Sequence, residues 1–162
     1  MKPIRKLTIS GIVMALYIAA MFLTQGFAFG QYQIRIATAL YSLSYFFPFL
    51  ILPLGLSNFL SNTFMGGLGP LDMIGGTLVG IITTGAIYLI RKMKWNKWLV
   101  TVPIVFGPGL LVPTWLSYLL HVPYSVLALS LCIGQIIPAI VGALLVKYAD
   151  RYLGKNLTTI IK

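Results

Sequence analysis

PLDMIGGTLVGIITTGAIYLI, residues 70–90, is the stretch that decides the fold class of this chain. Crossing the hydrocarbon core of a bilayer takes about 20 apolar residues at roughly 1.5 Å of rise each, and this stretch is long enough. Its only charged residue, Asp72, lies near the expected helix start, just after a proline. The stretch predicts a transmembrane helix that is entered through the helix-breaking residues 66–70, GGLGP.

The rest of the chain has the same character. Of its 162 residues, 59% are hydrophobic and only 9% are charged, which is too little charge to cover the surface of a soluble domain. Apolar stretches recur from Leu7 to Val146, so lipid must be the solvent for most of the surface. We therefore expect an all-α integral membrane protein with a single domain, residues 1–162.

Six transmembrane helices are predicted. Residues 36–63 are too long for one straight span, and Pro48 and Pro53 interrupt them, so we divide this part into two short helices that meet near Pro48. The basic start of the chain resembles a signal peptide, but the apolar run that follows is long enough to span, and we interpret it as an uncleaved first helix. The expected helices are residues 7–24, 36–47, 49–63, 70–90, 98–120 and 124–146.

Basic residues gather in three segments, and these set the expected orientation. They are Lys2, Arg5 and Lys6 at the start, Arg91, Lys92, Lys94 and Lys97 in one connection, and Lys147, Arg151, Lys155 and Lys162 at the end. Since basic connections stay in the cytoplasm, an even number of crossings must separate each pair of segments. Four crossings before Arg91 and two after it satisfy this condition, with both termini cytoplasmic in a multi-pass protein of the prokaryotic cell membrane. The net charge of +10 therefore reflects topology, and nucleic-acid binding is not expected.

Polar residues of the expected spans gather toward the outer side of the membrane. The topology places Arg35, Asn62, Asp72, Trp115 and Tyr118 at outer helix ends, with Asn58 and Gln135 deeper. Such a cavity suits a flat, nitrogen-rich solute, because an aromatic side chain can stack on its ring and a carboxylate can accept two N–H bonds from its edge. The inner helix halves have almost no polar groups, which argues against a continuous channel.

All of these candidates except Gln135 also have a purely structural interpretation, which the sequence leaves open. Asp72 is suited to capping its helix, and Arg35 to reaching the lipid headgroups. Asn58 and Asn62, four residues apart on one helix face, are suited to holding helices together, and the two aromatic residues to an interfacial belt. The second acid of the chain, Asp150, lies among basic residues, where we expect it to be solvated.

A stripe of small residues, Gly11, Ala15 and Ala19, recurs every four positions along the first helix. Small residues at this spacing form a smooth groove that another helix can approach closely. The partner is either a helix of this bundle or a separate membrane subunit.

Motifs for catalysis are missing. The chain has no G-x-x-x-x-G-K-[ST] phosphate loop, no H-E-x-x-H, no Ser/His/Asp set and no pair of carboxylates. Cys132 is its only cysteine and no Cys/His set could hold a metal. We expect neither an enzyme nor a protein that requires a metal or cofactor.

Three blocks of sequence, in order, resemble the QueT family: QYQIRIATAL at 31–40, LGLSNFLSN at 54–62 and GPLDMIGG at 69–76. Members of this family are substrate-binding S components of energy-coupling-factor (ECF) transporters and are associated with queuosine precursors. The resemblance covers almost the whole chain. At Thr38 the chain departs from the family pattern, in which many relatives have an acid, so that Asp72 is the one plausible acid for a guanine-like edge.

The resemblance implies a six-helix S component with an outward pocket for a deazaguanine base, such as queuine or a related precursor. It also implies a membrane T component and two cytoplasmic ATPases as partners, with transport by tilting of the S component in the membrane. The stripe of Gly11, Ala15 and Ala19 is similar to the alanine-rich motif that such proteins turn toward the T component. Two alternatives are an S component for another water-soluble vitamin and a structural subunit without a solute pocket.

Overall fold

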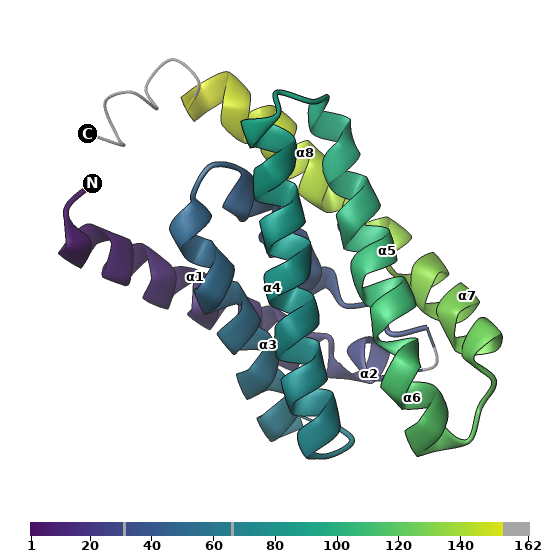
Figure 1. Cartoon of the computed structure of the whole chain (residues 1–162). Coiled ribbons are helices and arrows are strands. Elements are labelled where there is room, and N and C mark those ends of the chain that lie inside the picture. Colours follow the sequence, from purple (N-terminus) through teal and green to yellow (C-terminus); the bar gives the residue numbers. More distant parts are fainter. Residues whose placement is uncertain (31, 66, 154–162) are drawn as a thin grey trace.

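Inside a bilayer the backbone N–H and C=O groups must be satisfied within the protein, and this chain does so with helices. The computed structural model describes residues 1–30, 32–65 and 67–153, which contain helices and connections but no strand, so the all-α class is confirmed for them. Gln31, Gly66, Lys155 and Lys162 lie outside the described residues. In chain order the elements are α1 (Pro3–Leu23), α2 (Gln25–Ala28), η1 (Ile36–Tyr45), η2 (Pro48–Leu50), α3 (Ile51–Met65), α4 (Pro70–Lys92), η3 (Lys97–Val100), α5 (Thr101–Leu111), α6 (Pro113–Leu120), α7 (Tyr124–Gly134) and α8 (Ile136–Leu153) (Figure 1).

Among the described residues, four helical stretches are long and apolar enough to cross a membrane: Pro3–Leu23, Pro70–Lys92, Lys97–Leu120 and Tyr124–Tyr152. The two other predicted spans, residues 36–47 and 49–63, correspond to η1 and α3, which have 10 and 15 residues. Both are shorter than the roughly 20 residues that a straight α-helical span needs. The structure thus gives four candidate spans by length, and the count of six crossings stays a prediction.

The helix η1 is a 3₁₀-helix, which the sequence pattern does not distinguish from an α-helix. Its rise of roughly 2.0 Å per residue lets a few residues extend further than they would in an α-helix. Its polar side chains bond within the bundle: the Ser44 hydroxyl lies 2.7 Å from the Tyr41 carbonyl oxygen and 2.9 Å from that of Thr84. The chain turns at Phe46, directly after η1, and Pro48 begins the short helix η2.

Prolines divide the last two predicted spans. Residues 98–120 form η3, α5 and α6, and the break between α5 and α6 comes directly before Pro113. Residues 124–146 form α7 and the first part of α8. In a continuous helix the ring of Pro138 would clash with the carbonyl group of the residue four positions earlier. That residue is Gly134, at which α7 ends.

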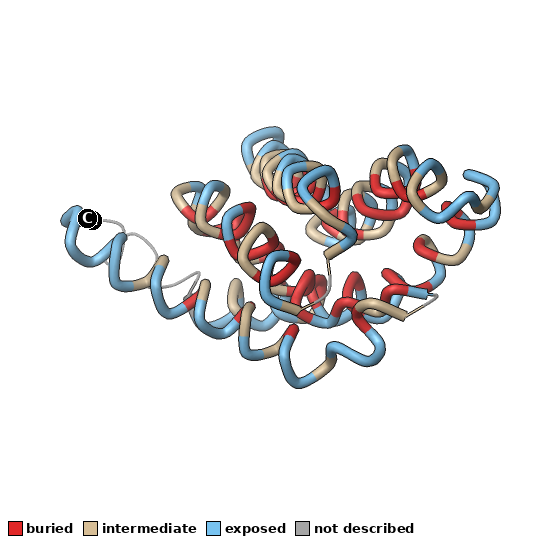
Figure 2. The backbone as a smooth tube through the Cα atoms, turned by 90° about the horizontal axis from the view of Figure 1, so that it is seen from below, coloured by how far each residue is buried: buried red, intermediate tan, exposed pale blue. Residues whose placement is uncertain are grey.

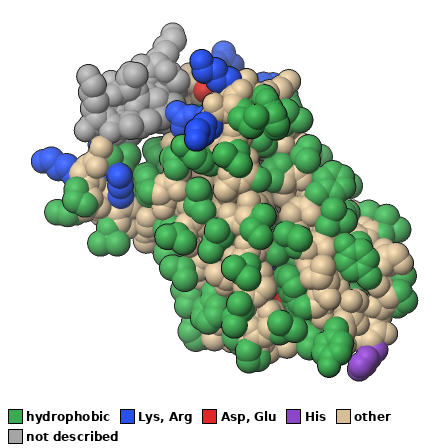
Figure 3. Space-filling model, in the orientation of Figure 1, with side chains coloured by type: hydrophobic (Ala, Val, Ile, Leu, Met, Phe, Trp, Pro, Cys, Tyr) green, Lys and Arg blue, Asp and Glu red, His purple; other side chains and the backbone are tan. Residues whose placement is uncertain are grey.

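The connections separate toward two ends of the bundle. The start of α1, the end of α8 and the basic α4–α5 connection lie in the upper part of Figure 1, whereas the α3–α4 and α6–α7 connections lie in the lower part. Figure 3 shows the same division by charge, with lysine and arginine toward the upper end and the single histidine at the lower end.

Helix faces that point inward make the core. α3 packs on α4 and α1, and η1 packs on α8 and α4. Buried positions follow the inner side of the helices in Figure 2, and exposed positions follow the outer side. The outer faces are nevertheless apolar (Figure 3), with exposed large side chains such as Ile4, Phe64 and Leu129. An apolar exterior is what lipid, and not water, favours.

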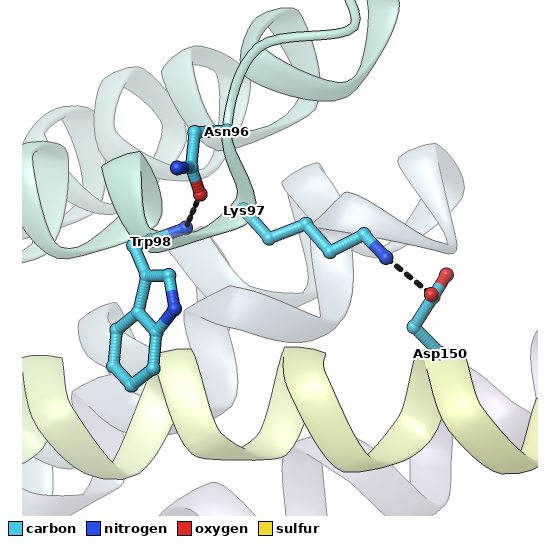
Figure 4. A network of polar contacts seen from close by, with 4 residues as sticks. All are labelled: Asn96, Lys97, Trp98 and Asp150. Atoms are coloured by element: carbon cyan, nitrogen blue, oxygen red, sulfur yellow. Dashed lines mark hydrogen bonds and ion pairs between the residues drawn. The ribbon is translucent and has the colours of Figure 1, made fainter.

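A salt bridge joins the α4–α5 connection to α8. The Lys97 ammonium group contacts the Asp150 carboxylate, and the Asn96 side chain accepts a bond from the Trp98 backbone N–H at 3.0 Å (Figure 4). Asp150, which we expect to be solvated, is 36% exposed at its side chain, and folding also brings Lys97 next to it. The pair anchors the basic connection to the last helix.

Candidate functional site

Glycines bring α3 and α4 close together at the position of the two asparagines. A Cβ atom on Gly76 would lie 2.7 Å from the Asn62 side-chain nitrogen, and one on Gly80 would lie 3.1 Å from the Gly55 Cα atom. Because no side chain intervenes, the Asn58 amide can donate to the Gly76 carbonyl oxygen at 2.7 Å. Asn58 and Asn62 therefore face α4 and are buried, as is typical of residues that hold helices together.

Arg35 joins the two asparagines from the segment between α2 and η1. Its Nη1 donates to Oδ1 of Asn58 at 3.1 Å and to Oδ1 of Asn62 at 3.3 Å, and its Nε donates to the Ala28 carbonyl oxygen at 3.3 Å. The side chain is only 5% exposed, and within the described residues it donates to neutral oxygens alone. It is thus a buried cation that bonds within the protein, whereas a snorkelling arginine extends its charged end toward the lipid headgroups.

Two tyrosines extend this network into the core. Asn58 Nδ2 donates to the Tyr41 hydroxyl at 3.2 Å, and the hydroxyls of Tyr41 and Tyr17 are 3.3 Å apart. The two rings stack at a centroid distance of 5.7 Å. Sequence reasoning missed both residues, because tyrosine in an apolar run shows no pattern that separates a buried hydroxyl from an interfacial one.

Asp72 lies in the first turn of α4, after Gly69, whose φ of 97° favours glycine. The carboxylate is 3% exposed. Its Oδ1 accepts the indole N–H of Trp115 at 2.9 Å, and its Oδ2 accepts the Leu68 backbone N–H at 3.3 Å. Both interpretations of Asp72 are thus compatible with the structure: it satisfies a backbone donor at the helix start, and it holds an aromatic residue of α6.

A cleft of about 430 Å³ opens beside this carboxylate. It lies between the segment after α2, the start of α4, and helices α6 and α7. Its walls are mostly aliphatic, with a few groups that could orient a ligand. These polar and aromatic groups are Asp72, Gln33, Ser130 and Phe29. A cavity of this size with few convergent polar groups is typical of a small-molecule site.

Phe29, Gln33 and Ser130 were not singled out from the sequence. Phe29 is tied to the buried network because the Arg35 guanidinium carbon lies 5.0 Å from its ring centroid. The backbone at Gln33 takes a positive φ of 43°, uncommon for a residue other than glycine, and this special turn is not readable from residue type alone.

Gln135 lies at the junction of α7 and α8, and it bonds to the segment that carries the cleft. The Thr38 hydroxyl donates to its Oε1 at 2.8 Å, and its Nε2 donates to the Gln33 carbonyl oxygen at 2.9 Å. Gln135 therefore positions a cleft residue and does not itself line the cleft. Thr38, where the family resemblance leads us to expect an acid, is the partner of this glutamine.

Tyr118 lies apart from the other candidates. Its side chain is 75% exposed and does not line the cleft, whereas Trp115 on the same helix is half-buried against Asp72. The structure brings the remaining candidates into two linked groups, but it leaves Tyr118 on the outer surface. That position is typical of an interfacial aromatic belt.

The stripe of Gly11, Ala15 and Ala19 faces away from the bundle. All three residues are exposed, and a Cβ atom on Gly11 would have no neighbour within 4 Å. The opposite face of α1 carries the buried residues Val13 and Tyr17. The stripe is thus not used for packing within the described part of this chain.

The described residues offer no candidate metal site. Residues 1–30, 32–65 and 67–153 contain no group of three His, Cys, Asp or Glu side chains that could hold an ion.

Comparison with protein families matches residues 7–151 to the model of the QueT transporter family. The chain belongs to the QueT transporter family. QueT membership and the four apolar helical stretches make it a membrane protein of a transporter family. The QueT match covers all three sequence blocks and every candidate residue named above. No curated protein and no solved structure matches the chain.

Proposed function

We propose that this chain is the S component of an ECF transporter and binds a queuosine precursor, a deazaguanine base, in the cleft beside Asp72. The observation that carries the proposal is a buried carboxylate that lines a cleft in a chain with only two acidic residues. Burying a carboxylate inside a membrane protein costs free energy, so such groups mark functional sites. Membership of the QueT transporter family supports the substrate class.

The carboxylate has room for a ligand. An ionised carboxylate offers about four acceptor positions, and Trp115 and the Leu68 backbone use one on each oxygen. The free positions suit the adjacent N–H donors of a guanine-like edge. Such charge-assisted bonds are roughly twice as strong as neutral ones.

Aromatic and polar groups around Asp72 suit the rest of a flat base. The Phe29 ring lines the cleft and could stack on the base, while the aliphatic side chains of α6 and α7 cover it. Gln33 and Ser130 offer polar groups at the wall of the cleft. Arg35, Asn58, Asn62 and Gln135 act behind the cleft by fixing the segment that carries Phe29 and Gln33.

We further propose six crossings with both termini in the cytoplasm. The gathering of basic residues at the end of the bundle opposite the α6–α7 connection supports this orientation. The helices η1 and α3 would then form a pair of short crossings, covered on several sides by α1, α4 and α8. The cleft would open to the exterior.

The partners that we propose are a membrane T component and two cytoplasmic ATPases, with tilting of this subunit as the transport step. The exposed stripe of Gly11, Ala15 and Ala19 supports docking of another membrane subunit, because it is smooth and free of neighbours within the described chain. Energy for uptake would come from ATP hydrolysis by those partners.

A binding assay tests the proposal. Purified protein in detergent is titrated with queuine, 7-aminomethyl- and 7-cyano-7-deazaguanine, and, as controls, with thiamine, biotin and riboflavin. The fluorescence of Trp115 reports binding because its indole contacts Asp72, and a Trp115→Phe variant identifies its share of the signal. We expect saturable binding of at least one deazaguanine. Binding of a control vitamin alone would assign another solute, and absence of all binding would favour a structural subunit.

A further inference from the structure

A second cavity lies at the end of the molecule where α1 begins and α4 ends. It is an open groove of about 630 Å³ between these helices and the turn that joins η1 to η2. We call it the basic groove. Among its lining residues, those that carry the argument are Lys6, Phe47, Phe49, Tyr88, Arg91 and Lys92. None of the candidate solute-binding residues lines it.

The cations of this groove have no carboxylate side chain to pair with. The chain contains two acidic residues. Asp72 lies at the opposite end of α4, about 30 Å from Lys92 at 1.5 Å per residue, and Asp150 is paired with Lys97. Neither acidic side chain of the chain therefore neutralises the positive charge of Lys6, Arg91 and Lys92.

The position of Arg91 is fixed before any ligand arrives. Its Nη1 donates to the carbonyl oxygens of Tyr45 at 3.0 Å and Phe46 at 2.9 Å, and the guanidinium carbon lies within 6 Å of both rings. These bonds use one of its nitrogens, and the others make no hydrogen bond within the described residues. An arginine held in this way can offer its remaining N–H groups to a phosphate with little loss of freedom.

The walls of the groove are aromatic. Phe47, Phe49 and Tyr88 line it, and the Lys6 ammonium group lies 6.0 Å from the Phe49 ring centroid. The groove lies where two apolar membrane-spanning stretches, Pro3–Leu23 and Pro70–Lys92, reach their basic ends. This is the level of the lipid headgroups, where basic pockets between transmembrane helices bind anionic lipids.

We infer that the basic groove binds one anionic phospholipid. Its phosphate lies among Lys6, Arg91 and Lys92, and its glycerol and first acyl carbons lie against Phe47 and Phe49. An acidic protein segment would match the charges, but it would leave the aromatic walls without an apolar partner. The inference does not depend on the solute cleft, which lies at the other end of α4.

Native mass spectrometry tests this inference. Protein in detergent is offered equal amounts of phosphatidylglycerol and phosphatidylcholine, and we expect selective retention of one phosphatidylglycerol. In the double variant Lys6→Gln/Lys92→Gln the affinity for that lipid should fall roughly tenfold, since each cation near the phosphate contributes to binding. The matched control is Lys2→Gln/Lys94→Gln, which removes two exposed cations outside the groove and should retain the lipid.

Three outcomes would overturn the inference. Equal lipid retention by the two double variants would show that the groove is not the site. Displacement of the lipid by an equal concentration of glycerol 3-phosphate would assign a soluble phosphate instead. Unchanged lipid binding with loss of a co-purifying membrane subunit in Lys6→Gln/Lys92→Gln would assign an acidic protein segment. Thermal unfolding shows whether each variant is folded, and Lys92→Gln alone, with an expected loss of roughly threefold, replaces the double variant if it is not.

Discussion

Arg35 and Asp72 are buried in the same region and carry opposite charges, but they form no ion pair with each other. Asn62 lies between them, accepting a bond from the Arg35 guanidinium and donating one to the Asp72 backbone oxygen at 3.1 Å. Within residues 1–30, 32–65 and 67–153, neither charge is paired with a side chain of opposite sign. Because buried charges are costly without a partner, the arrangement favours a ligand that completes it.

Replacing Asp72 tests the role of its charge. We expect Asp72→Asn to weaken the binding of a purine-like base by roughly 1.5–3 kcal/mol, since it removes a charged acceptor and places an amide where a donor is bound. Isothermal titration of the purified variant measures the change. Asp150→Asn removes the same charge at the other end of the molecule and should bind as the parent does. An unchanged affinity in Asp72→Asn would leave this residue with its helix-capping role alone.

The helix pair α3 and α4 depends on glycine for its close approach. At Gly76 a Cβ atom would press on the Asn62 amide, which bonds Asp72, whereas at Gly85 of the same helix it would meet nothing within 4 Å. The same substitution should therefore have opposite effects at these two positions.

We expect Gly76→Ala to lower the free energy of unfolding by roughly 1–3 kcal/mol, as overpacking does, and to weaken ligand binding as well. Gly85→Ala should leave stability unchanged or raise it, because alanine is the better helix former by about 1 kcal/mol. Thermal unfolding in detergent compares the two. Similar unfolding temperatures for both variants would mean that α3 and α4 are not packed as described.

The first helix has two different faces. Val13, Tyr17 and Met21 are buried against the bundle, while the stripe that begins at Gly11 is exposed. An exposed stripe of small residues should accept a second subunit without affecting the solute cleft, which other elements form.

Gly11→Leu should abolish co-purification with a T component, because the larger side chain prevents close helix contact, and it should leave solute binding intact. Pull-down of the co-expressed complex and titration with the base measure these two properties. Gly85→Leu places the same side chain at another open position and should not affect the complex. Retention of the T component by the Gly11 variant would contradict docking at the stripe.

Across the whole molecule, the two ends differ in charge. The basic α4–α5 connection carries Lys94, and the α6–α7 connection carries the single histidine, His121. Because one candidate span, Lys97–Leu120, separates them, the proposed topology puts the α4–α5 connection in the cytoplasm and the α6–α7 connection outside.

Cysteine labelling in intact cells measures this orientation. In a background where Cys132→Ser removes the only cysteine, His121→Cys should react with an impermeant maleimide from outside, and Lys94→Cys should react only after the membrane is opened. Labelling of both positions from the same side would rule out the proposed orientation.

The sequence by itself determined the properties that depend on local composition. Hydropathy and length gave a helical membrane protein, Pro48 marked the turn after the second helix, and three ordered blocks pointed to the family. These predictions succeed because the bilayer acts on each segment separately. A run of about 20 apolar residues is stable as a helix across the bilayer whatever its neighbours in the chain are.

The tertiary structure decided which polar groups meet. It placed Arg35 on two asparagines 23 and 27 residues away, joined Thr38 to Gln135 across 97 residues, and left Tyr118 outside the group. It also made η1 a 3₁₀-helix. Each outcome depends on the close approach of helices distant in sequence, and that approach is set by packing around the whole bundle, which no local pattern of residues encodes.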